Sequence, residues 1–175
     1  MKLSIRLVIV YVFLCAASVS FGQTIHYDYD RDANFSSYKT YQWIEVPGGI
    51  VPNQLQDQNI KRAIDAQLQQ KGLQKVDKDA DLHVGYEAAI DKEKQLNTFN
   101  MGPRWWGGGM GQATTSTISV GKLVVDMYDP ARKQLVWRGD ATKTLNPSKD
   151  PDKNYKNLEK AMAKLFKNYP PKAKK

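Results

Sequence analysis

The sequence predicts an α+β fold, a two-layer sandwich in which a mixed, mostly antiparallel sheet of four to five strands carries two helices on one face. Alternating apolar residues between Val120 and Thr142 indicate two antiparallel strands joined by a tight turn. Apolar residues at helical spacing follow Gln56 and again follow Asp150, and each run indicates an amphipathic helix. The expected order is strand, helix, strand, strand, strand, helix, with room for one extra strand at the start.

The first 22 residues have the features of a secretory signal. Lys2 and Arg6 give a positive start, and an almost unbroken apolar run extends from Leu7 to Val19. This run is shorter than the roughly 20 residues of a membrane-spanning helix, so cleavage after Gly22 is favoured over an uncleaved anchor. The only cysteine, Cys15, lies deep in this segment, so lipidation is not expected. We therefore expect an exported protein, periplasmic or associated with the outer membrane.

The mature chain, beginning at residue 23, contains no cysteine and must be stabilised by packing alone. Its length suffices for one hydrophobic core, so residues 23–171 are predicted to form a single domain, followed by a disordered basic tail at 172–175. Ten lysines lie between residues 143 and 175. They predict a weak attraction to anionic envelope polymers or lipid head groups, although a solvated helix face is the simpler explanation. No nucleic-acid partner is expected.

Two strands and a helix are expected in the first half of the domain. The leading strand covers Ile25 to Asp30, and a second strand ends at Trp43, with a turn at Arg31 to Asn34 between them. The first helix is predicted from about Gln56 to Lys71, with Gly72 in the left-handed position that ends it. Because this helix connects two strands, it favours their parallel pairing.

The next strand is predicted from Asp81 to Ile90, where alternate apolar residues share one face. From Asp91 to Thr117 no period is visible, and this stretch is predicted to be a long irregular loop. The central ribbon follows, with its turn at Asp129-Pro130 because proline cannot donate to a strand ladder. One face of its first strand is expected to consist of Leu123, Val125 and Met127, and one face of its second strand of Leu135, Trp137, Gly139 and Ala141. The last helix has Asp150 as its cap and ends before Pro170-Pro171.

Several short motifs occur in an order that resembles a known family. They are Phe35-Ser36-Ser37-Tyr38-Lys39-Thr40-Tyr41-Gln42-Trp43, Ala80-Asp81-Leu82, Gly121-Lys122-Leu123-Val124-Val125-Asp126, Leu135-Val136-Trp137-Arg138-Gly139 and Tyr169-Pro170-Pro171. Together they resemble the bacterial domain-of-unknown-function family 4136, whose members are exported envelope proteins, many of them lipoproteins. The resemblance implies an α+β envelope domain with no established activity and no catalytic residues to carry over. Here Gln23, and not a lipidated cysteine, follows the signal.

The two histidines of the mature chain, His26 and His83, are one candidate site. If their strands were adjacent, the two imidazoles with Asp28 or Glu87 could bind a metal ion. Neither histidine lies in a recognised ligand motif, so each is more simply a strand residue that faces water or a neighbouring side chain.

A second candidate site is Arg104-Trp105-Trp106 within a glycine-rich stretch. Adjacent indoles beside a cation offer flat apolar faces to a sugar ring, a peptide or a partner protein. The alternative is that the two indoles cover the open face of the sheet as a lid.

The sequence thus predicts a non-enzymatic binding or structural module of the cell envelope, with an envelope protein or a glycan as its partner. The alternative is a metal-dependent or hydrolytic enzyme that uses His26 and His83. On the first hypothesis we expect no catalytic residue, no cofactor and no metal ion, and Arg104, Trp105 and Trp106 are the expected contact residues.

Overall fold

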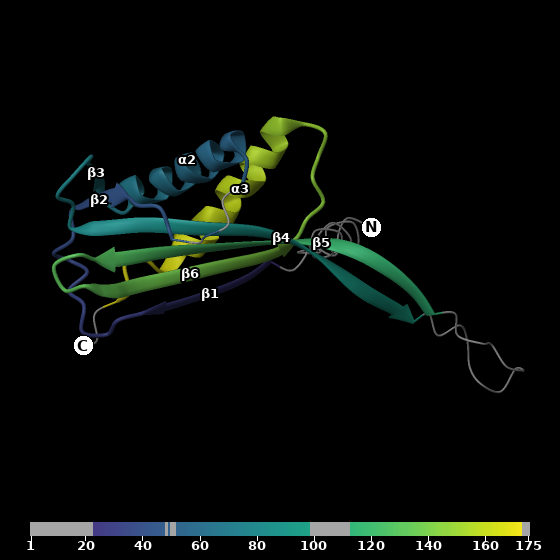
Figure 1. Ribbon diagram of the computed structural model, residues 1–175, viewed down its shortest axis with the longest axis horizontal. Coiled ribbons are helices and arrows are strands. Elements are labelled where there is room, and N and C mark those ends of the chain that lie inside the picture. Colours follow the sequence, from purple (N-terminus) through teal and green to yellow (C-terminus); the bar gives the residue numbers. More distant parts are fainter. Residues whose placement is uncertain (1–22, 48, 50–51, 99–112, 173–175) are drawn as a thin grey trace, which may run out of the picture.

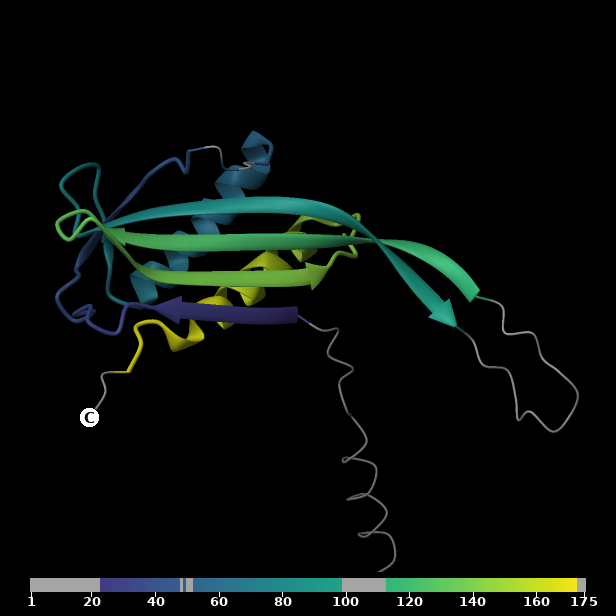
Figure 2. The same cartoon turned by 60° about the horizontal axis from the view of Figure 1, so that its bottom comes forward.

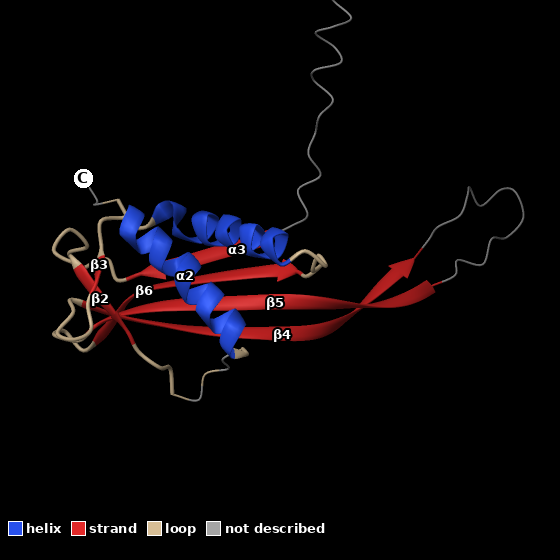
Figure 3. Ribbon diagram, turned by 90° about the horizontal axis from the view of Figure 1, so that it is seen from above, coloured by secondary structure: helices blue, strands red, loops and turns tan. Residues whose placement is uncertain are grey.

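The computed structural model describes residues 23–47, 49, 52–98 and 113–172. These residues form one sheet with two helices, α2 (Gln54–Gln70) and α3 (Pro151–Leu165), on the same face (Figure 1 and Figure 3). Within them the sheet has six strands in the order β1-β6-β5-β4-β2-β3. The α+β class and the placement of both helices on one face are confirmed, whereas the expected count of four to five strands is too low.

The strands are β1 (Gln23–Tyr29), β2 (Thr40–Trp43), β3 (Gln74–Lys75), β4 (Leu82–Thr98), β5 (Ala113–Asp129) and β6 (Gln134–Thr144). The strand missed by the sequence prediction is β3, because two residues are too few to show a period. β2 and β4 are neighbouring parallel strands. Because parallel strands need a crossover connection, the chain passes through α2 between them. The β1–β6, β6–β5 and β5–β4 pairs are antiparallel.

The predicted ribbon is formed by β5 and β6, but a β-bulge changes one of its faces. Met127 pairs with Trp137 and Tyr128 pairs with Leu135, so Val136 is an extra residue on β6. The extra residue shifts the alternation by one position, so Val136 is buried and Leu135 is 41% exposed. The prediction that Leu135 shares a face with Trp137, Gly139 and Ala141 is therefore wrong for Leu135, because it is exposed whereas the other three are buried.

The boundaries of α2 follow from local chemistry. The side chain of Asn53 accepts a hydrogen bond from the amide of Gln56 at 3.1 Å and caps the first turn. Gly72 has a φ of +87°, the left-handed conformation predicted for it, and the amide of Leu73 then bonds back to the carbonyl of Leu68 at 3.0 Å. The buried residues of the helix recur at helical spacing and are Ile60, Ala63, Ile64 and Leu68.

The carboxyl-terminal helix closes the core against the ribbon. Asp150 caps α3, and Pro151 occupies its first turn. Phe166, in the short helix η1 (Phe166–Asn168), stacks on Trp137 with ring centroids 5.3 Å apart. A Cβ atom at Gly139 would lie 2.3 Å from the Trp137 ring, so glycine at this position leaves space for the indole.

Residues 91–98 and 113–117 are strand, so the predicted irregular loop is wrong over these residues. The remaining part of that stretch, residues 99–112, lies outside the described chain. The error has a physical cause. A ribbon without a helix layer over it has no core face, and apolar alternation therefore gives no signal there.

Candidate functional site

A two-stranded arm, formed by residues 92–98 of β4 and 113–119 of β5, extends beyond the rest of the sheet (Figure 1 and Figure 2). The β5–β6 ladder ends with Val120 opposite Thr144, whereas β4–β5 pairing continues through seven more pairs to Thr98 opposite Ala113. At the strand rise of about 3.4 Å per residue, the arm is roughly 24 Å long. No third strand pairs with it within the described chain.

Burial along β4 shows where the helix layer stops. On the face that α2 covers, Leu82 and Val84 are fully buried and Tyr86 is 5% exposed, but Ile90 is 63% exposed. The strand therefore leaves the hydrophobic core before the arm begins.

The open face of the sheet, opposite α2 and α3, is crossed by charged pairs. Arg138 donates to both carboxylate oxygens of Asp126, its partner across the β5–β6 pair, at 2.6 and 2.5 Å. This pairing, together with the nearby carboxylates of Glu87 and Asp140, raises the pKa of the guanidinium. A depression of ≈ 290 Å³ on this face is lined by Lys122, Leu123, Val124, Arg138, Asp140, Ala141 and Thr142.

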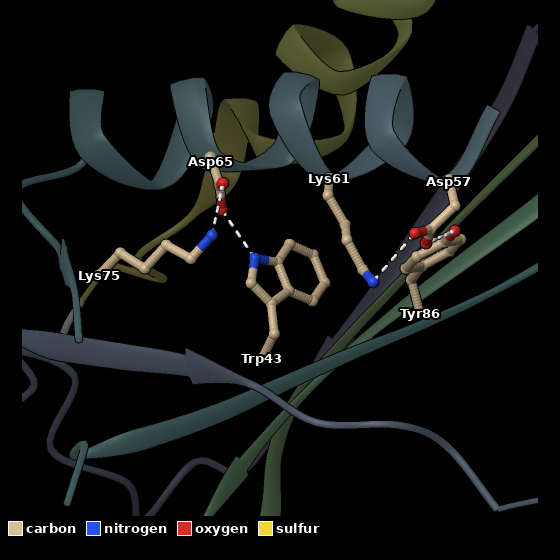
Figure 4. Close-up of polar contacts among 6 residues, drawn as sticks. All are labelled: Trp43, Asp57, Lys61, Asp65, Lys75 and Tyr86. Carbon is tan, nitrogen blue, oxygen red and sulfur yellow. Dashed lines mark hydrogen bonds and ion pairs between the residues drawn. The ribbon is translucent and has the colours of Figure 1, made fainter. Parts of the chain in front are cut away.

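Polar contacts also join α2 to the sheet beneath it (Figure 4). One carboxylate oxygen of Asp65 accepts from the Tyr41 hydroxyl at 2.7 Å and from the Trp43 indole at 2.9 Å. The other oxygen lies 3.2 Å from the ammonium of Lys75. Both oxygens therefore hold α2 on the sheet, so Asp65 has a structural role.

A second carboxylate on α2, Asp57, makes similar contacts. It accepts from the Tyr86 hydroxyl at 2.5 Å and from Lys61 at 3.1 Å (Figure 4). Although burial raises the pKa of Asp57, these two hydrogen bonds outweigh it and keep that pKa below its usual range. An acid held in its charged form is a poor proton donor at neutral pH.

Two further acids fix the ends of strands. Asp81 accepts from the backbone amides of Lys39 and Thr40 at 2.8 and 2.9 Å, and the first of these bonds is the main cause that lowers its pKa. Asp129 is 5% exposed, and it accepts hydrogen bonds from the amides of Ala131 and Arg132 in the turn and, at 2.8 Å, from the Tyr38 hydroxyl. Burial raises the pKa of Asp129, but these hydrogen bonds outweigh burial, so the pKa is lowered. Motif residues that carry the family resemblance therefore build the fold.

The two histidines do not form a site. His26 on β1 lies opposite Asp140, and His83 on β4 lies opposite Tyr128. Because β6 and β5 separate their strands, the two histidines are at least about 14 Å apart, three strand spacings. The hypothesis of a shared metal or hydrolytic site is wrong. In the described part of the chain, no three His, Cys, Asp or Glu residues could together hold a metal ion.

Arg104, Trp105 and Trp106 lie outside the described residues, so their contact role stays a prediction. The chain leaves β4 at Thr98 and returns to β5 at Ala113, at the far end of the arm. The sequence prediction missed the arm itself. The signal that could have revealed it is the run Thr114-Thr115-Ser116-Thr117, since threonine favours strands on exposed faces as well as on buried ones. Neither helix in the described ranges has the length and apolar character of a membrane span.

The comparisons with known proteins identify a family and a fold. The sequence matches the family described as Domain of unknown function (DUF4136) over residues 25–171, and no match was found among curated proteins. A PDZ domain protein from Parabacteroides distasonis aligns with a TM-score of 0.55 at 13% identity, covering 86% of this chain and 36% of that one. A PelC dodecamer from Paraburkholderia phytofirmans aligns with a TM-score of 0.51 at 11% identity, covering 83% and 95%. These similarities are in fold, and this chain spans little more than a third of the first structure.

Proposed function

The chain belongs to the family described as Domain of unknown function (DUF4136), and from this premise we propose that it is a non-enzymatic binding module of the cell envelope whose contact element is the arm. Export to the periplasm, with or without association to the outer membrane, is part of this proposal. The signal-like features of residues 1–22 support it, and so does β1, whose first paired residue is Gln23. Cleavage after Gly22 would leave all seven residues of β1 in place.

The observation that carries the proposal is the continuation of the β4–β5 ladder to Thr98 opposite Ala113, beyond every other strand of the described sheet. A paired ribbon without a hydrophobic layer gains little stability from its own side chains. Its outward edges carry backbone donors and acceptors that can pair with an extended segment of another protein. The arm is therefore better explained as a contact element than as part of the core.

The kind of partner that fits is an envelope protein that adds a strand to the arm. A second copy of this chain would be one such partner. The PelC structure of similar fold is a dodecamer, which supports a role in assembly for this fold. Arg104, Trp105 and Trp106 are proposed to add side-chain contacts to the same partner, because they are connected to the arm at both ends. A glycan is the other partner class that these indoles would suit.

Site-specific crosslinking in living cells tests the proposal. A photo-reactive residue at Ile90, at the base of the arm, is expected to give defined protein adducts. The same residue at Leu55 on α2 is a matched control, because both side chains are large, apolar and exposed, at 63% and 73%. Adducts at Leu55 but not at Ile90, or the same adducts at both positions, would contradict the proposal.

A second variant separates the arm from the side chains beyond it. Joining Asp91 to Val120 through an Asn-Gly turn removes the arm and keeps the pair that precedes it, Asp91 opposite Val120. The melting temperature should change little, and the Ile90 adducts should disappear. Trp105→Ala with Trp106→Ala should weaken the adducts without affecting the melt. Unchanged adducts in the arm-less variant would show that the arm is not the contact element.

A further inference from the structure

We propose that α3 carries a second binding surface, separate from the arm, for a linear anionic polysaccharide. The surface is the lysine stripe, which consists of Lys153, Lys156, Lys160, Lys164 and Lys167. The spacings of three, four, four and three residues place all five on one side of the helix and its η1 extension. All five are exposed, and the stripe is about 21 Å long at 1.5 Å per residue.

The charges of the stripe are available to a ligand. The ion pairs within the described chain involve Lys61, Lys75, Lys122, Arg132 and Arg138, and none involves a stripe lysine. Two of the nearby acids, Asp150 and Asp152, lie at the start of the helix, where Asp150 is its cap. Glu159 is the one acid between the stripe positions. Five cations on a line with one interspersed acid give a strongly positive strip.

The neighbouring helix favours a sugar polymer over a membrane. α2 contacts α3. Six of its eight exposed residues are amides, and the other two are Leu55 and Arg62; the amides are Gln54, Gln56, Gln58, Asn59, Gln69 and Gln70. Amides donate to and accept from hydroxyl groups, and ammonium groups bind carboxylates or sulfates, so the two helices together offer the chemistry that an acidic sugar needs.

A lipid surface fits this region less well. Binding in the plane of a membrane requires apolar side chains that enter the head-group region beside the cations. The large apolar residues of α3 face the protein instead: Met162 and Leu165 are buried, and Leu158 packs against the core. Most of the positive charge also lies on α3, since the one exposed cation of α2 is Arg62, whereas a flat bilayer would be matched by cations across both helices.

Binding of fluorescent polygalacturonate, a linear carboxylated polysaccharide, to the mature protein tests this inference. If all five lysines contact the polymer, raising salt from about 50 to about 200 mM should weaken binding roughly a hundredfold through counterion release. Lys156→Gln, Lys160→Gln and Lys164→Gln together should reduce this salt effect to roughly sevenfold and weaken binding at low salt by at least tenfold. Glutamine has nearly the helix propensity of lysine, so the fold should be retained.

Two controls accompany the triple variant. The corresponding Lys→Arg triple keeps the charge and should bind like the unmodified protein. Gln at Lys39, Lys71 and Lys78, which lie outside α3, removes the same net charge and should change binding by less than about twofold if the stripe is the site. Neutral dextran should not bind.

Several results would overturn the inference. The first is that the unmodified protein does not bind polygalacturonate at low salt. The second is that the Lys39, Lys71 and Lys78 control loses as much binding as the stripe variant, and the third is that the stripe variant binds as well as the unmodified protein. Tighter binding to phosphatidylglycerol vesicles, with the same dependence on the stripe, would assign the surface to membranes instead. Because the arm is unchanged in all these variants, crosslinking at Ile90 should remain, and the two proposals can fail independently.

Discussion

Replacement of Asp65 by alanine is expected to destabilise the domain by roughly 2–4 kcal/mol, because one carboxylate satisfies three donors. The largest loss is at Tyr41, which is fully buried and would keep a hydroxyl with no acceptor, at a cost of about 1–3 kcal/mol. The Trp43 indole is only partly buried and can reach water, so its loss is smaller. The exposed ion pair with Lys75 contributes about 0–1 kcal/mol.

The assay is urea unfolding followed by tryptophan fluorescence, with the free energy of unfolding extrapolated to water. Asp65→Asn keeps one acceptor oxygen and should lose less stability than Asp65→Ala. Adding Tyr41→Phe to Asp65→Ala removes the orphaned hydroxyl, so the double variant should be no less stable than Asp65→Ala alone, and the two changes should be strongly non-additive. Additive losses, or a loss below about 0.5 kcal/mol for Asp65→Ala, would refute the assignment.

Three other predictions concern the core, the pH dependence and the amino terminus. Gly139→Ala should lower the free energy of unfolding, measured in urea, by about 1–3 kcal/mol because the new Cβ would lie 2.3 Å from the Trp137 ring. In Gly121→Ala the new Cβ would meet only the flexible end of a leucine side chain, so the loss should be less than about 1 kcal/mol. Equal losses in the two variants would contradict this explanation. The folded-state pKa of Asp81 is lowered, so its stabilising contribution is present above the unfolded-state pKa of about 3.9 and is lost as pH falls through the folded value. Asp81→Asn should therefore reduce the loss of stability between about pH 7 and pH 3, and an unchanged pH profile would exclude this role. Intact-mass analysis of the exported protein should give a chain that begins at Gln23; a retained amino-terminal segment would disprove cleavage after Gly22.

The parts of the fold that bury an apolar face were predictable from the sequence. The helix stripe of α2 and the β5–β6 ribbon follow from a 3.6-residue and a 2-residue period, because each element has one face in the same core. Gly72 and Asp150 mark helix ends through local geometry that does not depend on the rest of the molecule. These features are determined by neighbouring residues or by a single buried face.

The features that were missed depend on partners far away in sequence. The exposure of Leu135 follows from a bulge opposite Tyr128, and a bulge is a property of two strands together. The separation of His26 from His83 follows from the order of strands in the sheet. Strand order is not contained in the period of either strand, so the hypothesis of a histidine site could be tested only against the topology.

The arrangement of acids explains why the proposals concern surfaces. Asp65 and Asp57 each accept a hydrogen bond from a tyrosine hydroxyl beneath α2. Asp81 and Asp129 each accept hydrogen bonds from backbone amides at strand ends. General acid–base catalysis needs a group whose pKa lies near the working pH and that can exchange its proton with a substrate. The pKa values of Asp57, Asp81 and Asp129 are lowered instead, and their oxygens hold the fold. Within the described chain, the arm pairs with no third strand and the lysine stripe presents five exposed ammonium groups, so both offer groups that another molecule can bind.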